Sequence, residues 1–226
     1  MCGRFVRSSS LRKICEHFDV KHPSFEAEPS YNIAPSQSVL IINKPGARQL
    51  ANCKWGFVPS WAKDLSTGCK MINARVESVT EKPAFKTAFR KQRCLVVANS
   101  FYEWQKDMKR KIPAYISLKS GALFGFAGLY NAWTSPDGEK VCTCTILTTE
   151  SNKLLSAIHD RMPVIVPSDK EDLWLAPEVE DAEVLKGFLR PFPSEEMVLT
   201  RVSDRVNSPT YDSPENIKPL YGKNVC

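Results

Sequence analysis

Short hydrophobic runs, many of them with alternating polar positions, dominate the pattern along the chain. Runs of about four to eight such residues, bounded by turn-forming residues, predict β-strands. We predict strands over Gly3–Arg7, Val39–Asn43, Gln49–Trp55, Cys94–Ala98, Phe101–Gln105, Ala114–Leu118, Leu123–Leu129, Val141–Thr148, Pro163–Val166 and Met197–Val202. The dipeptide Asp137-Gly138 lies between two of these runs and predicts a hairpin turn.

Fewer segments have a helical period. Leu11, Ile14, Cys15 and Phe18 fall on one helical face, and Ser9 or Ser10 suits the N-cap position. We predict further helices over Glu81–Arg90, Asn152–Ile158, Asp169–Leu175 and Ala182–Leu189. Strands with helices inserted at irregular intervals predict an α+β fold around an antiparallel or mixed sheet.

The chain shows no internal repeat and no low-complexity tract. Its 226 residues suit one domain, and 16 scattered prolines favour a domain rich in loops over two domains joined by a linker. Hydrophobic residues at 42% and charged residues at 25% are enough for a folded core, which excludes disorder for most of the chain. We therefore predict a single domain over residues 1–226, with 209–226 as an irregular tail.

Composition also limits the location and the cofactors. No run of about 18 apolar residues is present, so no membrane-spanning helix is expected. The first residues lack the apolar block of a secretory signal, which predicts a cytoplasmic protein, at the nucleoid if the source is bacterial. Eight cysteines without a Cys-x-x-Cys pair, and only three histidines, predict free thiols, no metal site and no cofactor.

Charge is unevenly distributed, within a net charge of +6. Residues 81–111 hold nine basic residues against three acidic ones, interleaved with Phe85, Phe89, Phe101, Tyr102 and Trp104. Cations for phosphates and rings for bases are what a single-stranded nucleic-acid groove uses. Strands and helices with basic surfaces explain the same pattern. The acidic run over 169–183 is interpreted as a solvated face.

The segment Met1-Cys2-Gly3-Arg4-Phe5 offers unusual chemistry. Removal of Met1 would leave a terminal cysteine, which carries an amine of pKa about 8 beside a thiol of pKa about 8.5. The amine can condense with an aldehyde to an imine, and the thiol can then close a thiazolidine ring. Arg4 could bind a phosphate. From this pentapeptide alone, Cys2 as an ordinary second residue is the stronger interpretation.

Three further polar residues are candidates for the chemistry. Glu103 shares a strand face with Phe101, where a carboxyl group has a raised pKa and acts as an acid, unless it is simply exposed. His159, beside an acid and an arginine, is a candidate proton shuttle or a structural histidine. Asn73 could orient an amine or carbonyl, and Arg75 on the same face could bind a phosphate, unless both belong to an ordinary polar strand face.

Six short motifs occur in order along the chain: Met1-Cys2-Gly3-Arg4-Phe5, Tyr31-Asn32-Ile33-Ala34-Pro35, Trp55-Gly56-Phe57-Val58-Pro59-Ser60-Trp61, Ile72-Asn73-Ala74-Arg75-Val76-Glu77, Phe101-Tyr102-Glu103-Trp104 and Ile158-His159-Asp160-Arg161-Met162-Pro163. Together they resemble the SOS response-associated peptidase (SRAP) family, also described as abasic-site processing proteins. The resemblance runs from residue 1 to about residue 208. It implies a single α+β domain with a branched, mostly antiparallel or mixed sheet, a small barrel and peripheral helices.

The resemblance also implies a function in DNA damage and repair. The protein would bind single-stranded DNA as a monomer and link Cys2, freed of Met1, covalently to the aldehyde of an abasic site, with reversal and lyase activity as further steps. Asn73 would orient the amine, Glu103 would act as general acid–base and His159 would shuttle protons. Arg4, Arg75 and Arg161 would hold phosphates, and Pro35, Trp61 and Thr148 would line the DNA path.

Two other functions stay open on the sequence. Cys2 could be the nucleophile of a peptidase, including one that cleaves the Met1–Cys2 bond of its own chain. A papain-like protease is disfavoured because the local cysteine signature is missing. The chain could also be a non-catalytic module that binds single-stranded nucleic acid. Binding by such a module would survive Cys2→Ala and would leave no bond that resists denaturation.

Overall fold

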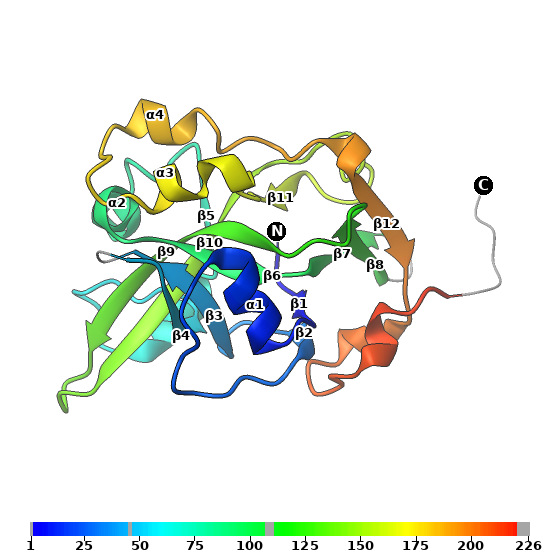
Figure 1. Cartoon of the computed structure of the whole chain (residues 1–226), viewed down its shortest axis with the longest axis horizontal. Helices are drawn as coiled ribbons and strands as arrows, with labels where there is room; N and C mark the ends of the chain where they lie inside the picture. The colour runs from blue at the N-terminus through cyan, green and yellow to red at the C-terminus, as the bar shows by residue number, and fades with distance from the viewer. Residues whose placement is uncertain (1, 45–46, 107–110, 221–226) are drawn as a thin grey trace.

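The strands form two sheets that meet around a common core (Figure 1). The computed structural model describes residues 2–44, 47–106 and 111–220. Its strands are β1 (Phe5–Arg7), β2 (Ser30–Ile33), β3 (Ser38–Asn43), β4 (Gln49–Trp55), β5 (Asn73–Arg75), β6 (Arg93–Ala98), β7 (Ser100–Lys106), β8 (Lys111–Leu118), β9 (Phe124–Thr134), β10 (Lys140–Glu150), β11 (Arg161–Pro163) and β12 (Met197–Arg201). The α-helices are α1 (Leu11–Phe18), α2 (Pro83–Lys91), α3 (Glu171–Leu175) and α4 (Ala182–Lys186). Within these ranges no helix has the length and hydrophobicity to cross a bilayer.

Five strands close into a small barrel. β4 pairs with β3, β3 with β6, β6 with β9, and β9 with β10, all antiparallel. A short parallel pairing of β10 with β4, Cys144 opposite Trp55, completes the ring. Because a closed ring leaves no free edge, the hydrogen bonds of these strands are satisfied within the barrel.

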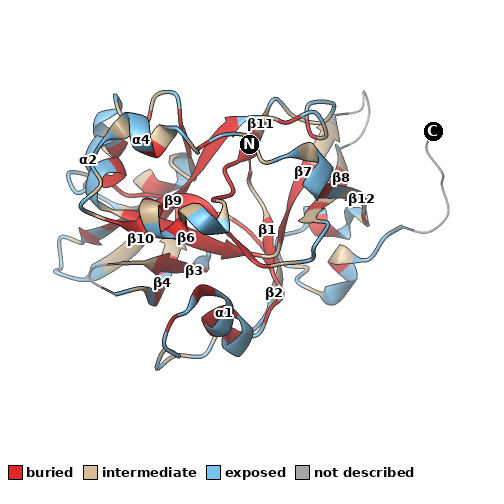
Figure 2. Ribbon diagram, turned by 45° about the horizontal axis from the view of Figure 1, so that its top comes forward, coloured by how far each residue is buried: buried red, intermediate tan, exposed pale blue. Residues whose placement is uncertain are grey.

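Alternate side chains of the barrel strands enter two different cores. On β3, Val39 and Ile41 face the interior, whereas Leu40 and Ile42 join the outer cluster. Burial on both faces explains why this strand reads as a continuous apolar run. Figure 2 shows the buried residues concentrated on these central strands.

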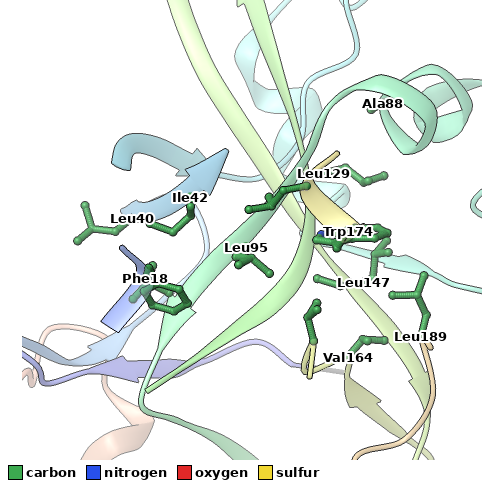
Figure 3. Packing of buried hydrophobic residues seen from close by; sticks show 14 of the residues in the cluster. Phe18, Leu40, Ile42, Ala88, Leu95, Leu129, Leu147, Val164, Trp174 and Leu189 are labelled. Carbon is green, nitrogen blue, oxygen red and sulfur yellow. The ribbon is translucent and has the colours of Figure 1, made fainter. Parts of the chain in front are cut away.

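The outer face of the barrel is covered by helices. Phe18 of α1, Trp174 of α3 and Leu185 of α4 belong to the outer cluster, part of which is drawn in Figure 3. Helix α1 begins where Ser10 Oγ accepts a hydrogen bond from Lys13 N, and its apolar stripe is buried. The helices therefore cover the outer face of the barrel, whereas the second sheet packs against its interior cluster.

The second sheet has the order β12-β8-β7-β1-β2 and is antiparallel throughout. Its inner face, with Phe5 and Phe101, packs into the barrel interior. The opposite face, with Val6 and Tyr102, is covered by Val206 from the C-terminal segment. Strand β10 is longer than the barrel needs, and its end pairs with β5 on one side and β11 on the other.

Most predicted elements are confirmed, including the α+β class, the small barrel and the hairpin turn, where Gly138 has φ 85°. The helix predicted over Asn152–Ile158 is wrong, because this segment forms turns. There the Asn152 side chain caps one turn by accepting a hydrogen bond from Leu155 N, and Ser156 N donates to Asn152 O, but the bonding does not continue as a regular helix. Strand β2 was not predicted, because its four residues are too short to show a period.

Candidate active site

Cys2 is separated from β1 by Gly3 and Arg4 and lies at the end of the barrel interior. The residue is fully buried and belongs to the interior core cluster. Its carbonyl oxygen accepts a hydrogen bond of 2.8 Å from Asn73 Nδ2. Burial, followed by the negative charge of Glu103, raises the pKa of the Cys2 thiol far above its ordinary value. The thiol in this state is therefore protonated at neutral pH.

Strand pairing brings Glu103 to the same place. Phe5 pairs with Phe101 on the antiparallel strands β1 and β7, so Glu103 lies opposite Gly3. The side chain is 3% exposed, so the interpretation of Glu103 as a surface residue is wrong. Burial raises its pKa, because the charged carboxylate loses hydration and the neutral carboxyl group is favoured. Glu103 is therefore suited to general acid–base work beside Cys2.

Asn73 is fixed by the branch of the sheet. It is the first residue of β5, and it pairs with Ile146 on β10. The preceding carbonyl, Ile72 O, accepts hydrogen bonds from Trp55 Nε1 at 2.9 Å and from Ile146 N at 3.1 Å. Asn73 Oδ1 is buried and has no hydrogen-bond partner within the described part of the chain. The amide thus holds Cys2 with its nitrogen and keeps an acceptor for a further donor.

His159 follows the turns at 152–158 and comes just before β11. Its Nδ1 accepts a hydrogen bond of 3.0 Å from the backbone nitrogen of Arg161 and lies 2.8 Å from Asp160 Oδ1. The charge of Asp160 also contributes to the raised pKa of Glu103. The four candidate catalytic residues come from four separate segments. Asn73 is hydrogen-bonded to Cys2, Cys2 is within the electrostatic influence of Glu103, and Glu103 is within that of Asp160 beside His159.

Arg4 lies beside this group with neutral partners. Its Nη1 donates to Asn32 Oδ1 at 2.7 Å and to Val206 O at 2.8 Å, and its guanidinium stacks on Trp104, 5.7 Å from the ring centroid. Burial lowers its pKa, but an arginine remains charged. Because these partners carry no charge, they orient the guanidinium without neutralising it, which suits an anion.

Arg75 and Arg161 lie on either side of the end of β10. Thr148 pairs with Arg75 on β5 and with Pro163 on β11. Arg161 forms a bidentate ion pair with Glu77, at 2.8 and 2.9 Å, and also donates to Thr148 O. Arg75 is exposed, whereas Thr148 is buried. Thr148 therefore supports Arg161 from beneath, through its carbonyl.

Pro35 and Trp61 lie on loops after β2 and β4. Pro35 is half-buried and is followed by Ser36, whose φ of 72° is left-handed. Trp61 is 66% exposed, the largest exposed fraction among the exposed large hydrophobic side chains of the described residues. Both residues are accessible to a ligand from solvent, and a tryptophan exposed to this extent is the more unusual of the two.

The basic and aromatic stretch over 81–111 does not form the predicted groove of stacking rings. Phe85 and Phe89 lie in the outer core, and Phe101 and Tyr102 are buried in the second sheet. Their rings face inward because the helical and strand periods direct them to the core. Only Trp104, half-buried beneath Arg4, keeps an accessible ring among these five. Residues 107–110 lie outside the described residues, as does Met1.

Sequence reasoning did not identify Asn32, Glu77 and Asp160 as part of the site. Asn32 is buried, and its Oδ1 accepts the hydrogen bond from Arg4 Nη1. Its Nδ2 donates to the carbonyl oxygens of Val206, Ser208 and Tyr211. An asparagine inside a short apolar strand motif was the available signal. Among the described residues no group of three or more His, Cys, Asp and Glu side chains could hold a metal ion.

Comparison with known proteins identifies relatives for nearly the full chain. The family model described as SOS response associated peptidase (SRAP) matches residues 1–209. The chain is 47% identical over 222 residues to "Abasic site processing protein YoqW" of Bacillus subtilis, covering 96% of this chain and 99% of that protein. It is 32% identical over 261 residues to "Abasic site processing protein HMCES" of Xenopus tropicalis, covering 95% and 77%.

Solved structures share the fold. A crystal structure of a protein from Bacteroides thetaiotaomicron superposes with a TM-score of 0.85 at 27% sequence identity, covering 97% of this chain and 100% of that one. A protein from Bordetella bronchiseptica superposes with a TM-score of 0.79 at 26% identity, covering 89% and 100%. The barrel and its branched sheet are therefore an established architecture.

Proposed function

This chain belongs to the SOS response associated peptidase family, and from that premise we propose that it processes abasic sites in DNA by forming a covalent link through Cys2. The observation that carries the proposal is the environment of Cys2, which is buried, held at its carbonyl by Asn73 and lies in the field of a buried Glu103. The relatives named above as abasic site processing proteins support the substrate.

The link begins with the α-amine of Cys2, which is free only after Met1 has been removed. The amine adds to the aldehyde carbon of the ring-opened sugar, and loss of water gives an imine. The Cys2 sulfur then adds to the imine carbon while the nitrogen takes up the proton, so that a thiazolidine forms. One C–N and one C–S bond replace the two bonds of the carbonyl group, and the carbonyl oxygen leaves as water with the two hydrogens that the amine gives up.

Glu103 and His159 supply the proton transfers in this proposal. Glu103, with a pKa raised by burial, can donate a proton to the departing hydroxyl and take one from the thiol. His159, whose Nδ1 lies 2.8 Å from Asp160 Oδ1, transfers protons during opening of the sugar ring and during reversal of the link. Asn73 Oδ1, which has no partner within the described residues, receives the Cys2 amine and aims it at the aldehyde.

Three arginines hold the DNA backbone in this proposal. Arg4 binds a phosphate beside Cys2, while Arg75 and Arg161 bind phosphates along the β5–β10–β11 edge. Pro35 and Trp61 line the path of the strand, and Thr148 acts through the carbonyl that orients Arg161. A single strand fits because an abasic nucleotide without a partner is easily drawn out of the stack.

The covalent link is tested with single-stranded DNA that carries one abasic site, alongside intact DNA of the same sequence. Each DNA is mixed with protein lacking Met1, boiled in detergent and separated on a denaturing gel. We expect a shifted band with abasic DNA alone, lost in Cys2→Ala and retained in Cys69→Ala, which removes an exposed thiol elsewhere. Salt-sensitive binding to both DNAs without a shifted band would instead indicate a non-catalytic binding module.

Removal of Met1 is proposed to be autocatalytic, with Cys2 as nucleophile and Glu103 as its acid–base partner. Intact mass spectrometry of protein made without an aminopeptidase tests this step. We expect a chain that starts at Cys2, and a chain that keeps Met1 in Glu103→Gln. Equal removal of Met1 in both proteins would assign the cleavage to another enzyme and leave the crosslinking proposal intact.

Strand cleavage and monomeric state complete the proposal. The imine makes the neighbouring C–H bond acidic, so β-elimination would release a shortened DNA visible on the same gel. Light scattering of the protein with and without DNA tests the monomer. A dimer in both samples would contradict that part of the proposal alone.

A further inference from the structure

The barrel interior holds a group of thiols that the proposed DNA chemistry does not use. Cys53 on β4, Cys94 on β6 and Cys144 on β10 are buried, while Cys142 on β10 is half-buried. All four are free thiols in this structure. Cys142 and Cys144 lie two residues apart and so share the face of β10 that lines the interior.

The register of the barrel places Cys53 against Cys142. In the parallel pairing of β4 with β10, Lys54 lies opposite Thr143 and Trp55 opposite Cys144. Continued by one position, the same register sets Cys53 opposite Cys142, and the Cys53 thiol lies within hydrogen-bonding reach of the thiols of both Cys142 and Cys144. Paired strands are about 4.8 Å apart. This separation lies within the range of about 4.4–6.8 Å that a disulfide spans between Cα atoms.

The two thiols differ in the way that a reactive pair requires. Cys142 is open to solvent in part, and the hydrogen bond from Cys53 lowers its pKa. Burial raises the pKa of Cys53, which holds it as the protonated donor. A partly exposed thiol with a lowered pKa beside a second cysteine is the arrangement typical of oxidation to a disulfide.

We propose that Cys142 and Cys53 form a modification site that takes peroxides and closes to an intramolecular disulfide between β10 and β4. The Cys142 thiolate attacks one peroxide oxygen, and the O–O bond breaks to give a sulfenic acid and, after protonation, water or an alcohol. Cys53 sulfur then attacks Cys142 sulfur, and the sulfenic oxygen leaves as water with the Cys53 proton. The peroxide is reduced by two electrons, and the two thiols are oxidised.

The disulfide would join the parallel pair of strands that closes the barrel. This pairing is short, and Gly56 N to Cys144 O at 2.8 Å is the next backbone hydrogen bond along it. A covalent bond here closes a long loop of chain, so it restricts the unfolded state strongly. We expect oxidised protein to melt at a higher temperature than reduced protein.

The site is tested on the full chain, first reduced and then treated with one to a few equivalents of hydrogen peroxide. Remaining thiols are alkylated, and the protein is digested with trypsin. We expect peptide 49–54 joined to peptide 141–153, with a mass two hydrogens below their sum, and separation of the peptides by a reducing agent. Peptide 141–153 contains two cysteines, so fragment ions from cleavage between Cys142 and Cys144 show which of the two is bonded to Cys53.

Variants and melting curves provide the controls. Cys144→Ser and Cys15→Ser should keep the joined peptide, whereas Cys142→Ser should lose it. The proposal is overturned if both thiols remain fully alkylated, if Cys53 is joined to Cys144, or if Cys142 is oxidised to sulfinic acid without the joined peptide. An unchanged or lower melting temperature of the joined protein would refute the predicted stabilisation of the barrel closure.

Discussion

Glu103 illustrates how one side chain can be set for chemistry by its surroundings. A carboxyl group loses hydration when it is buried, so its neutral form is favoured and its pKa is raised. Strand β7 creates this environment by placing Glu103 on the same face as the buried Phe101. The result is an acid–base group that costs stability at neutral pH, as active-site residues commonly do.

Replacing Glu103 with glutamine should therefore stabilise the fold while slowing the crosslinking reaction. Because the pKa of Glu103 is higher in the folded than in the unfolded state, the folded state binds more protons between those two values. The free energy of unfolding then falls as the pH rises through this window. We expect Glu103→Gln to exceed the parent in urea stability at pH 7, and the difference to shrink towards pH 4.

The control for this experiment is Glu139→Gln, at an exposed position of the β9–β10 hairpin. It should change stability little at any pH. Once Met1 has been removed from both proteins by an aminopeptidase, crosslinking by Glu103→Gln should be slower than that of the parent by about 10²- to 10⁴-fold, the usual contribution of a general acid–base group. A stability difference that grows as the pH falls would contradict the assignment of a raised pKa.

Arg75 should contribute charge more than structure. The residue is exposed at the end of β5, two residues along the strand from Asn73, and loss of its side chain leaves the core intact. We expect Arg75→Gln to weaken single-stranded DNA binding and to reduce the slope of log K against log salt by about 0.7, the value for one phosphate contact. Lys119→Gln, at an exposed position after β8, is the matched control, and equal effects of both would exclude a local contact.

Short connections, rather than long strands or helices, determine where the site residues lie. The 3₁₀ turn over Leu65–Lys70 leads into β5, and its Gly68 lies against Gly56 at the end of β4. A Cβ atom on Gly68 would lie 2.4 Å from Gly56 O. The two backbones can meet only because both residues lack a side chain, and this contact helps to fix the approach to Asn73.

Substitution of Gly68 by alanine should thus disturb both stability and function. Neither backbone can yield cheaply, so we expect a loss of about 1–3 kcal/mol in the free energy of unfolding, as for other overpacked sites. The rate of crosslinking should fall as well, because β5 carries Asn73. Gly187→Ala at the end of α4, where the nearest atom is 3.3 Å away, should cost less. Equal losses of stability in the two variants would refute the proposed role of the Gly56–Gly68 contact.

The C-terminal segment joins the second sheet to the remainder of the fold. Asp212 accepts hydrogen bonds from Ser30 Oγ and Tyr31 N, and Asn216 is fully buried. Leu220 N donates to Arg201 O on β12. Residues 209–220 are mostly irregular, with one 3₁₀ turn at Pro214–Ile217, yet they form several hydrogen bonds with β2, among them one from the buried Asn32 to Tyr211 O.

A chain that ends at Ser208 should consequently be less stable than one that ends at Leu220. Such a chain loses the hydrogen bonds of Tyr211 and Asp212 to β2, although Asn32 still donates to Val206 O and Ser208 O. We expect a cost of at least about 2 kcal/mol, or a fall of about 4–8 °C in the melting temperature. Arg4 should also lose its fixed orientation, so that crosslinking weakens. Identical melting curves for the two chains would show that the segment is dispensable.

Local patterns were sufficient for most strands, for helix α1 with its Ser10 cap, and for the hairpin at Asp137-Gly138. These features depend on periodicity and turn chemistry within a few neighbouring residues, which the sequence displays directly. The ordered short motifs likewise predicted the family and the residues Cys2, Asn73, Glu103 and His159 as its candidate site. Asn152–Ile158 was assigned wrongly because its weak helical pattern supports only successive turns, the first of them capped by the Asn152 side chain.

Burial and pairing between distant segments could not be predicted in the same way. Whether Glu103 faced solvent or the core depended on the register of β7 against β1, about a hundred residues away in the chain. The parallel closure of β4 on β10, the support of Arg4 by Asn32 and the inward direction of Phe85 depend on contacts of the same kind. Each such contact is favourable only together with the many others in the packed core. The arrangement of these residues is therefore determined by the folded structure as a whole and not by any short stretch of sequence.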